Sequence, residues 1–123
     1  MNGKLVMAAT LAASVLVSGV ALARAASEKA TVSGEVIDSA CYIKMGAKGP
    51  DHAQCAESCA KAGIPLALLT DDGKVVWLAS NKDMESANGV LMPYVAKKVT
   101  LEGTWYERGG TKLFAIDKVT PVK

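Results

Sequence analysis

The chain has 123 residues, a length that suits one domain. Its 14 lysines and arginines against 12 aspartates and glutamates give a formal net charge of +2. Lys4 and Arg24 account for that excess, and both belong to an N-terminal segment with the character of a targeting signal. The rest of the chain is formally neutral, so we expect no nucleic-acid partner. The sequence does not identify a protein partner.

The N-terminal segment contains an uncharged run from Leu5 to Ala23, which follows Lys4 and ends in Ala-x-Ala sequences. A basic start, an apolar middle and a small-residue exit predict a secretory signal peptide over residues 1–25, followed by a domain over 26–123. The alternative is a retained membrane anchor, because the run is long enough to span a bilayer. We therefore expect a periplasmic or secreted protein, or one anchored in the inner membrane with its domain facing the periplasm. A membrane is a partner only if the segment is retained.

Alternating apolar and polar residues predict five strands in the rest of the chain, and capping signals predict two helices between them. Asp72-Gly73 and the sequence "ERGGT" mark two hairpin turns, and Gly89 marks the end of the second helix. In chain order the expected elements are a strand within 30–42, a helix over 50–62, a hairpin over 65–80, a short helix within 80–89 and a hairpin over 99–119.

This order is typical of a mainly β (α+β) fold, a small five-stranded OB-like barrel with a helix between its third and fourth strands. Here an additional helix is inserted after the first strand. Gly34 and Gly103 stand at inward positions in mid-strand, where a tightly coiled barrel bends. Alternation also predicts that Trp77, Trp105 and Phe114 lie in the core. The alternative is an α+β sheet with a different strand order.

The inserted helix carries the only histidine and two of the three cysteines. At about 100° per residue, His52, Cys55 and Cys59 share a narrow arc on the inward half of the helix. Cys41 follows the first strand and is the natural fourth member. Thiolate and imidazole ligands suit copper or zinc, so we predict a metal site formed by these four residues. Met45 could add a thioether as a further ligand.

Two other interpretations fit the same cluster. Export favours disulfides, and a bridge from Cys41 to Cys55 or Cys59 would leave one free thiol in a structural or partner-binding domain. A thiol redox protein is the second alternative, with Cys55 as the reactive cysteine because it lies nearest the helix start. The spacing does not match the C-x-x-C-H motif of covalent haem attachment. We predict no catalytic residues, and we expect binding in preference to enzymatic catalysis.

Three stretches carry a resemblance to known proteins, and they read "GEVIDSACY", "HAQCAESCAKAGIPLALLTDDGKVVWL" and "YVAKKVTLEGTWYERGGTKLFAIDKV". Together they resemble a family of small exported bacterial proteins with the pattern G-x-V-x-D-x-x-C, then H-x-x-C-x-x-x-C-x-x-x-G, then a closing hairpin. The hairpin half is also similar to periplasmic OB-fold domains that bind ligands without being enzymes. The resemblance implies export, an OB-like domain and a joint role for Cys41, His52, Cys55 and Cys59. It implies no substrate.

Overall fold

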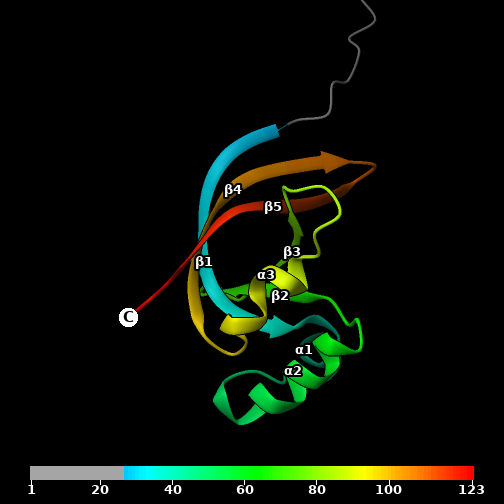
Figure 1. Ribbon diagram of the computed structural model, residues 1–123, viewed down its shortest axis with the longest axis vertical. Helices are drawn as coiled ribbons and strands as arrows, with labels where there is room; N and C mark the ends of the chain where they lie inside the picture. Colours follow the sequence, from blue (N-terminus) through cyan, green and yellow to red (C-terminus); the bar gives the residue numbers. More distant parts are fainter. Residues whose placement is uncertain (1–26) are drawn as a thin grey trace, which may run out of the picture.

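The computed structural model describes residues 27–123, which form a closed barrel with three short α-helices (Figure 1). The signal peptide predicted over residues 1–25 lies outside the described residues. The elements are β1 Ser27–Asp38, α1 Ser39–Met45, η1 Pro50–His52, α2 Ala53–Lys61, β2 Leu66–Thr70, β3 Val75–Ser80, α3 Ala87–Leu91, η2 Met92–Tyr94, β4 Lys98–Arg108 and β5 Thr111–Pro121, where η denotes a 3-10 turn. Within 27–123, no helix has both the length and the apolar character needed to cross a membrane.

The strands close in the order β1-β2-β3-β5-β4, which confirms the predicted OB-like barrel. β1 is antiparallel to both β4 and β2, and Gly34 pairs with Val99 on one side and Thr70 on the other. β3 runs parallel to β5 over Leu78–Ser80 and closes the barrel there. A register shift between Glu102 and Gly103 interrupts the pairing of β4 with β5. Both predicted bending positions therefore lie where the sheet changes partner or register.

The barrel interior is filled by inward-facing residues from every strand, and helices cover parts of its surface. Trp105 packs edge-on against Phe114, with ring centroids 5.1 Å apart. Trp77 is 43 % exposed, so its predicted core position is wrong. It alternates with Val76 and Leu78, and those two residues contribute to the core. The buried members of the main cluster are Val36, Ala56, Ala60, Leu66, Leu68, Val76, Leu91, Val95, Val99, Leu101, Phe114 and Ile116.

The helices differ from the sequence prediction in three ways. Helix α1, which the Asp38 side chain caps, follows β1 at a place where the sequence predicted no helix. The predicted 50–62 helix begins as the 3-10 turn η1 and continues as α2. α3 begins at Ala87 after a Ser86 cap, and Gly89 lies inside it and does not end it. A side-chain cap fixes where a short helix starts more strongly than glycine fixes where it stops.

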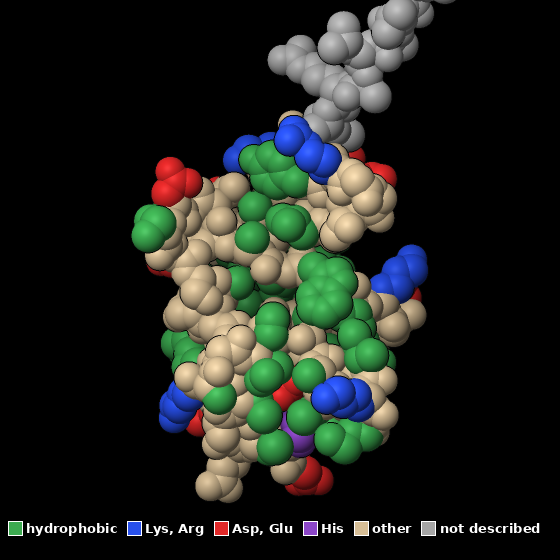
Figure 2. Space-filling model, turned by 90° about the vertical axis from the view of Figure 1, so that its right-hand side faces the viewer, with side chains coloured by type: hydrophobic (Ala, Val, Ile, Leu, Met, Phe, Trp, Pro, Cys, Tyr) green, Lys and Arg blue, Asp and Glu red, His purple; other side chains and the backbone are tan. Residues whose placement is uncertain are grey.

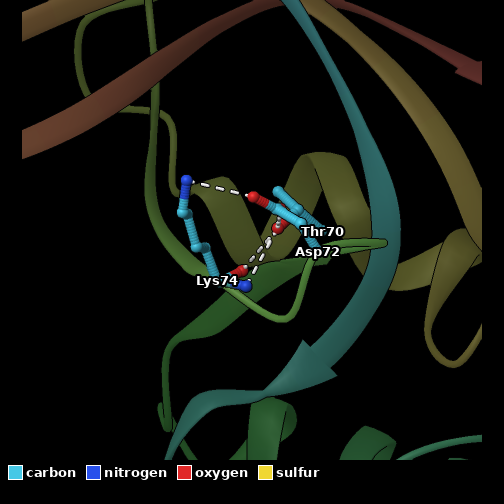
Figure 3. Close-up of polar contacts among 3 residues, drawn as sticks. All are labelled: Thr70, Asp72 and Lys74. Carbon is cyan, nitrogen blue, oxygen red and sulfur yellow. Dashed lines mark hydrogen bonds and ion pairs between the residues drawn. The ribbon is translucent and has the colours of Figure 1, made fainter.

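In the β2–β3 turn, the Asp72 side chain bonds to residues of the hairpin itself (Figure 3). The Thr70 hydroxyl donates to Asp72 Oδ1 (2.5 Å) and accepts the backbone N–H of Lys74 (3.0 Å). Lys74 Nζ lies 3.0 Å from Asp72 Oδ2. The hydroxyl and the ammonium group together lower the pKa of Asp72 below its ordinary value. The predicted Asp72-Gly73 turn is thereby confirmed.

The barrel glycines provide a test of this packing. A Cβ at Gly34 would overlap the Leu69 carbonyl oxygen, and one at Gly103 would overlap that of Ala115. Because backbone carbonyls cannot rotate away, Gly34→Ala and Gly103→Ala should each destabilise the fold by about 1–3 kcal/mol in chemical denaturation. Gly89→Ala is the control, since a Cβ added there would have no atom within 4 Å apart from its chain neighbours and its own helix backbone. Unchanged midpoints in both strand variants would contradict the close strand contacts.

Candidate metal centre

The predicted site residues gather where α1 and α2 lie together at one end of the barrel (Figure 1). α1 packs through Tyr42 on the cluster formed by Ile37, Ala67 and Leu69. α2 turns Ala56 and Ala60 into the main core. Both helices are therefore held by ordinary core packing, which fixes the side chains between them. On the surface, apolar side chains gather in a band along one face of the molecule (Figure 2).

Asp38 ends β1 and begins α1, and it is 1 % exposed. Its Oδ1 atom accepts the backbone N–H of Cys41 at 2.9 Å, which makes it the N-cap of α1. The Ser39 hydroxyl donates to the Pro65 carbonyl at 2.7 Å and ties the same turn to the start of β2. These bonds set the position of Cys41 relative to the barrel. Asp38 was not among the predicted site residues, although its place in the G-x-V-x-D-x-x-C pattern was a signal.

Asn88, on α3, holds the C-terminal end of α2 in place beside the barrel. Its Oδ1 accepts the Leu66 backbone N–H at 2.8 Å, and its Nδ2 donates to the carbonyls of Ala60 (3.1 Å) and Ile64 (2.8 Å). One side chain therefore joins the end of α2, the following loop and the start of β2. No sequence pattern indicated this role, because the bonded partners lie 22 to 28 residues away.

The three cysteines lie close together, with Cys41 beside the two cysteines that helical spacing placed on one face. The sulfur atoms of Cys41, Cys55 and Cys59 all lie within 4.8 Å of one another, and all three thiols are free. Cys41 and Cys59 are partly buried, whereas Cys55 is exposed and so does not face inward as expected. Two thiols from α2 and one from α1 thus lie close enough together for a single metal ion to bind all three.

His52 joins Cys41 in a second group and not in the thiol group. One nitrogen of His52, the Cys41 sulfur and a carboxylate oxygen of Asp38 lie within 4.8 Å of one another. His52 is the last residue of η1, so its side chain leaves the chain before the regular 100° spacing of α2 begins. The structure therefore divides the predicted set of four into two triads that share Cys41.

Met45, named as a further ligand, is the last residue of α1 and stands one helical turn after Cys41. It is 70 % exposed. A role for its thioether stays a prediction.

The carboxylate of Asp38 governs the charge state of the site. Burial acts to raise the pKa of Asp38, but the Cys41 backbone N–H and the neighbouring thiols of Cys59 and Cys41 outweigh it, so the pKa lies below its ordinary value. The same carboxylate raises the pKa of Cys59 to about 12, first through its polar contact with the thiol and second together with burial of the thiol. The pKa of Cys41 is raised as well, mainly by burial and then by Asp38. Without a metal, these two cysteines are therefore thiols at neutral pH.

Comparison with family models, with curated proteins and with solved structures found no match to this chain. The family resemblance accordingly stays a prediction, and the geometry of the site carries the functional argument.

Thiol reactivity provides a direct test of the electrostatics. In metal-free, reduced protein at pH 7, iodoacetamide should modify Cys55 well before Cys41 and Cys59, because only the thiolate reacts and the two raised pKa values suppress it. Peptide mass spectrometry gives the three rates. Cys59 should stay slow until the pH rises far above 9. Equal rates at the three positions would contradict the contact of Cys59 with Asp38.

Asn88→Ala should lower the free energy of unfolding by about 1–3 kcal/mol, since it leaves several part-buried backbone groups without partners. Thermal or urea unfolding measures the loss. Asn81→Ala is the matched control, because Asn81 is exposed and its amide bonds only to exposed Asp117. If the two variants unfold alike, Asn88 does not anchor α2.

Proposed function

We propose that this protein is a small exported metal-binding domain that holds one soft transition-metal ion through Cys41, Cys55 and Cys59. The observation that supports it is the mutual approach of three free sulfur atoms to within 4.8 Å, from two separate helices. Metal–sulfur bonds of about 2.3 Å in a tetrahedral site put sulfur atoms about 3.8 Å apart. A contraction of about 1 Å is within reach of side-chain rotation, so the residues fit a bound ion.

Copper(I) is the metal that the thiol group suits best. Three thiolates form a soft ligand set, and soft ligands select copper(I) as well as zinc. Structural zinc sites almost always have four ligands, whereas the fourth predicted residue, His52, groups with Cys41 and Asp38. The proposed location is the periplasm or the medium, as the signal-like N-terminus predicts, and the domain acts by binding and not by catalysis.

A thiol redox function is the second candidate, and the exposure of Cys55 beside two part-buried thiols favours it. In that case the Cys55 thiolate attacks a disulfide of a partner protein and releases one partner thiolate. Cys41 or Cys59 then attacks the mixed disulfide, so this protein is oxidised to a disulfide and the partner is reduced by two electrons. A purely structural disulfide between Cys41 and Cys55 or Cys59 is the remaining alternative.

The proposal is tested on protein isolated from the periplasm after expression of the full sequence. Denaturing alkylation with and without reductant counts free thiols, and elemental analysis of a parallel sample gives the bound metal. We expect three free thiols once the metal is removed, and one equivalent of copper(I) taken from a chromophoric chelator. Cys41→Ser, Cys55→Ser and Cys59→Ser should each weaken copper(I) binding at least about 10-fold.

Met84→Leu is the control for a sulfur atom outside the site, because Met84 is fully exposed on the loop before α3, and it should bind copper(I) like the unchanged protein. One free thiol without reductant and no bound metal would overturn the proposal and support a disulfide. A disulfide that forms and breaks reversibly in glutathione buffers, with the third thiol free, would favour the redox candidate.

A further inference from the structure

Two buried polar atoms near the thiol group have no hydrogen-bond partner. They are Oδ2 of Asp38 and Nε2 of His52, and they are the only such side-chain atoms in residues 27–123. The Cys59 and Cys41 thiols lie beside the carboxylate, but no donor reaches Oδ2 with hydrogen-bond geometry. An unsatisfied buried polar group costs about 1–3 kcal/mol, so the occurrence of both in one place calls for a ligand.

Water does not satisfy these atoms from the crevice they share. Asp38 and His52 both line a narrow crevice between β1 and the segment 47–49, and it has no room for a water molecule. Ala56 and Ala96 complete its apolar part. The chain is held tightly there, since Gly49 donates its backbone N–H to Glu35 Oε1 at 2.5 Å. A cation bonded directly to Asp38 and His52 would satisfy both atoms without needing the space of a water molecule.

The donor atoms have the chemistry and the separation of a metal site. Asp38 offers an oxygen, His52 a nitrogen and Cys41 a sulfur, all within 4.8 Å of one another. In tetrahedral zinc coordination, a nitrogen and an oxygen lie about 3.3 Å apart, and sulfur lies about 3.6 Å from either. From separations of no more than 4.8 Å, the three donors need to close by at most about 1.2–1.5 Å.

We propose that Asp38, Cys41 and His52 form a second metal site, which takes a borderline divalent cation such as zinc. This inference deepens the proposed function: the two sites share only the Cys41 sulfur. The mixed oxygen, nitrogen and sulfur set is harder than three thiolates, so it favours a borderline cation over copper(I). His52 is therefore a ligand of this second site and not the fourth ligand of the thiol site.

The test removes the thiol site and keeps the second one. Cys55→Ser/Cys59→Ser protein, made from the full sequence, is titrated with Co²⁺ as an optical probe and then with Zn²⁺. We expect one equivalent of Co²⁺ to bind with a charge-transfer band from a single sulfur, Zn²⁺ to displace it, and Zn²⁺ to shift the ring resonances of His52. Adding Asp38→Asn or His52→Ala should weaken Co²⁺ binding at least about 10-fold.

The variants separate ligation from folding. Asn caps helices as well as Asp, so Asp38→Asn keeps the bond to the Cys41 N–H while it removes the charged oxygen, and circular dichroism checks the fold. Asp51→Asn is the matched control, because Asp51 is exposed beside His52 and should leave Co²⁺ affinity unchanged. If Asp38→Asn and His52→Ala bind Co²⁺ like their parent, the assignment is wrong.

The two proposals fail in different ways. If the unchanged protein takes up copper(I) but the Cys55→Ser/Cys59→Ser variant binds no Co²⁺, the second site is overturned and the thiol site stands. Asp38 and His52 are then a structural pair that closes into a direct hydrogen bond. If the variant binds Co²⁺ through one sulfur but the unchanged protein takes up no copper(I), the second site stands and the thiol site is overturned.

Discussion

The hydrogen bond from the Cys41 backbone N–H to Asp38 is the interaction on which the candidate site depends. It ends β1, starts α1 and fixes the direction in which the Cys41 thiol leaves the chain. The same carboxylate stabilises the protonated form of Cys59, so it links the two helices electrostatically as well as sterically. One buried charge at the end of a strand therefore organises donors from three different elements.

The barrel provides a rigid frame that holds the donor groups of the candidate site in place. β1 is held on both sides by β2 and β4, so Asp38 at its end has little freedom. α2 is anchored through Ala56 and Ala60 in the core and through the amide of Asn88. The donor groups of the candidate site are therefore held close together by the fold itself.

A metal ion would compete with protons for the sulfur atoms of the site, so the protonation of the thiols affects its binding. Because the pKa values of Cys41 and Cys59 are raised, an incoming ion must displace their protons to obtain thiolate ligands. Asp38 is placed to bind an ion itself, since its carboxylate lies against both thiols. A shared sulfur at Cys41 makes the two triads neighbours, so an ion in one would alter the donor strength available to the other.

The amino-acid sequence by itself determined the strands, the two hairpins and the shared face of Cys55 and Cys59, because these follow from periodicity, turn chemistry and spacing within one helix. Alternation did not tell which face of β3 points inward, and Trp77 lies outside the core for that reason. The pairing of His52 with Asp38 was likewise beyond the sequence, since a 3-10 turn begins α2 and the two residues lie 14 positions apart. Only the closed barrel brings the end of β1 against α2, because burial of Asp38 and the bonds of Asn88 arise between segments that are distant along the chain.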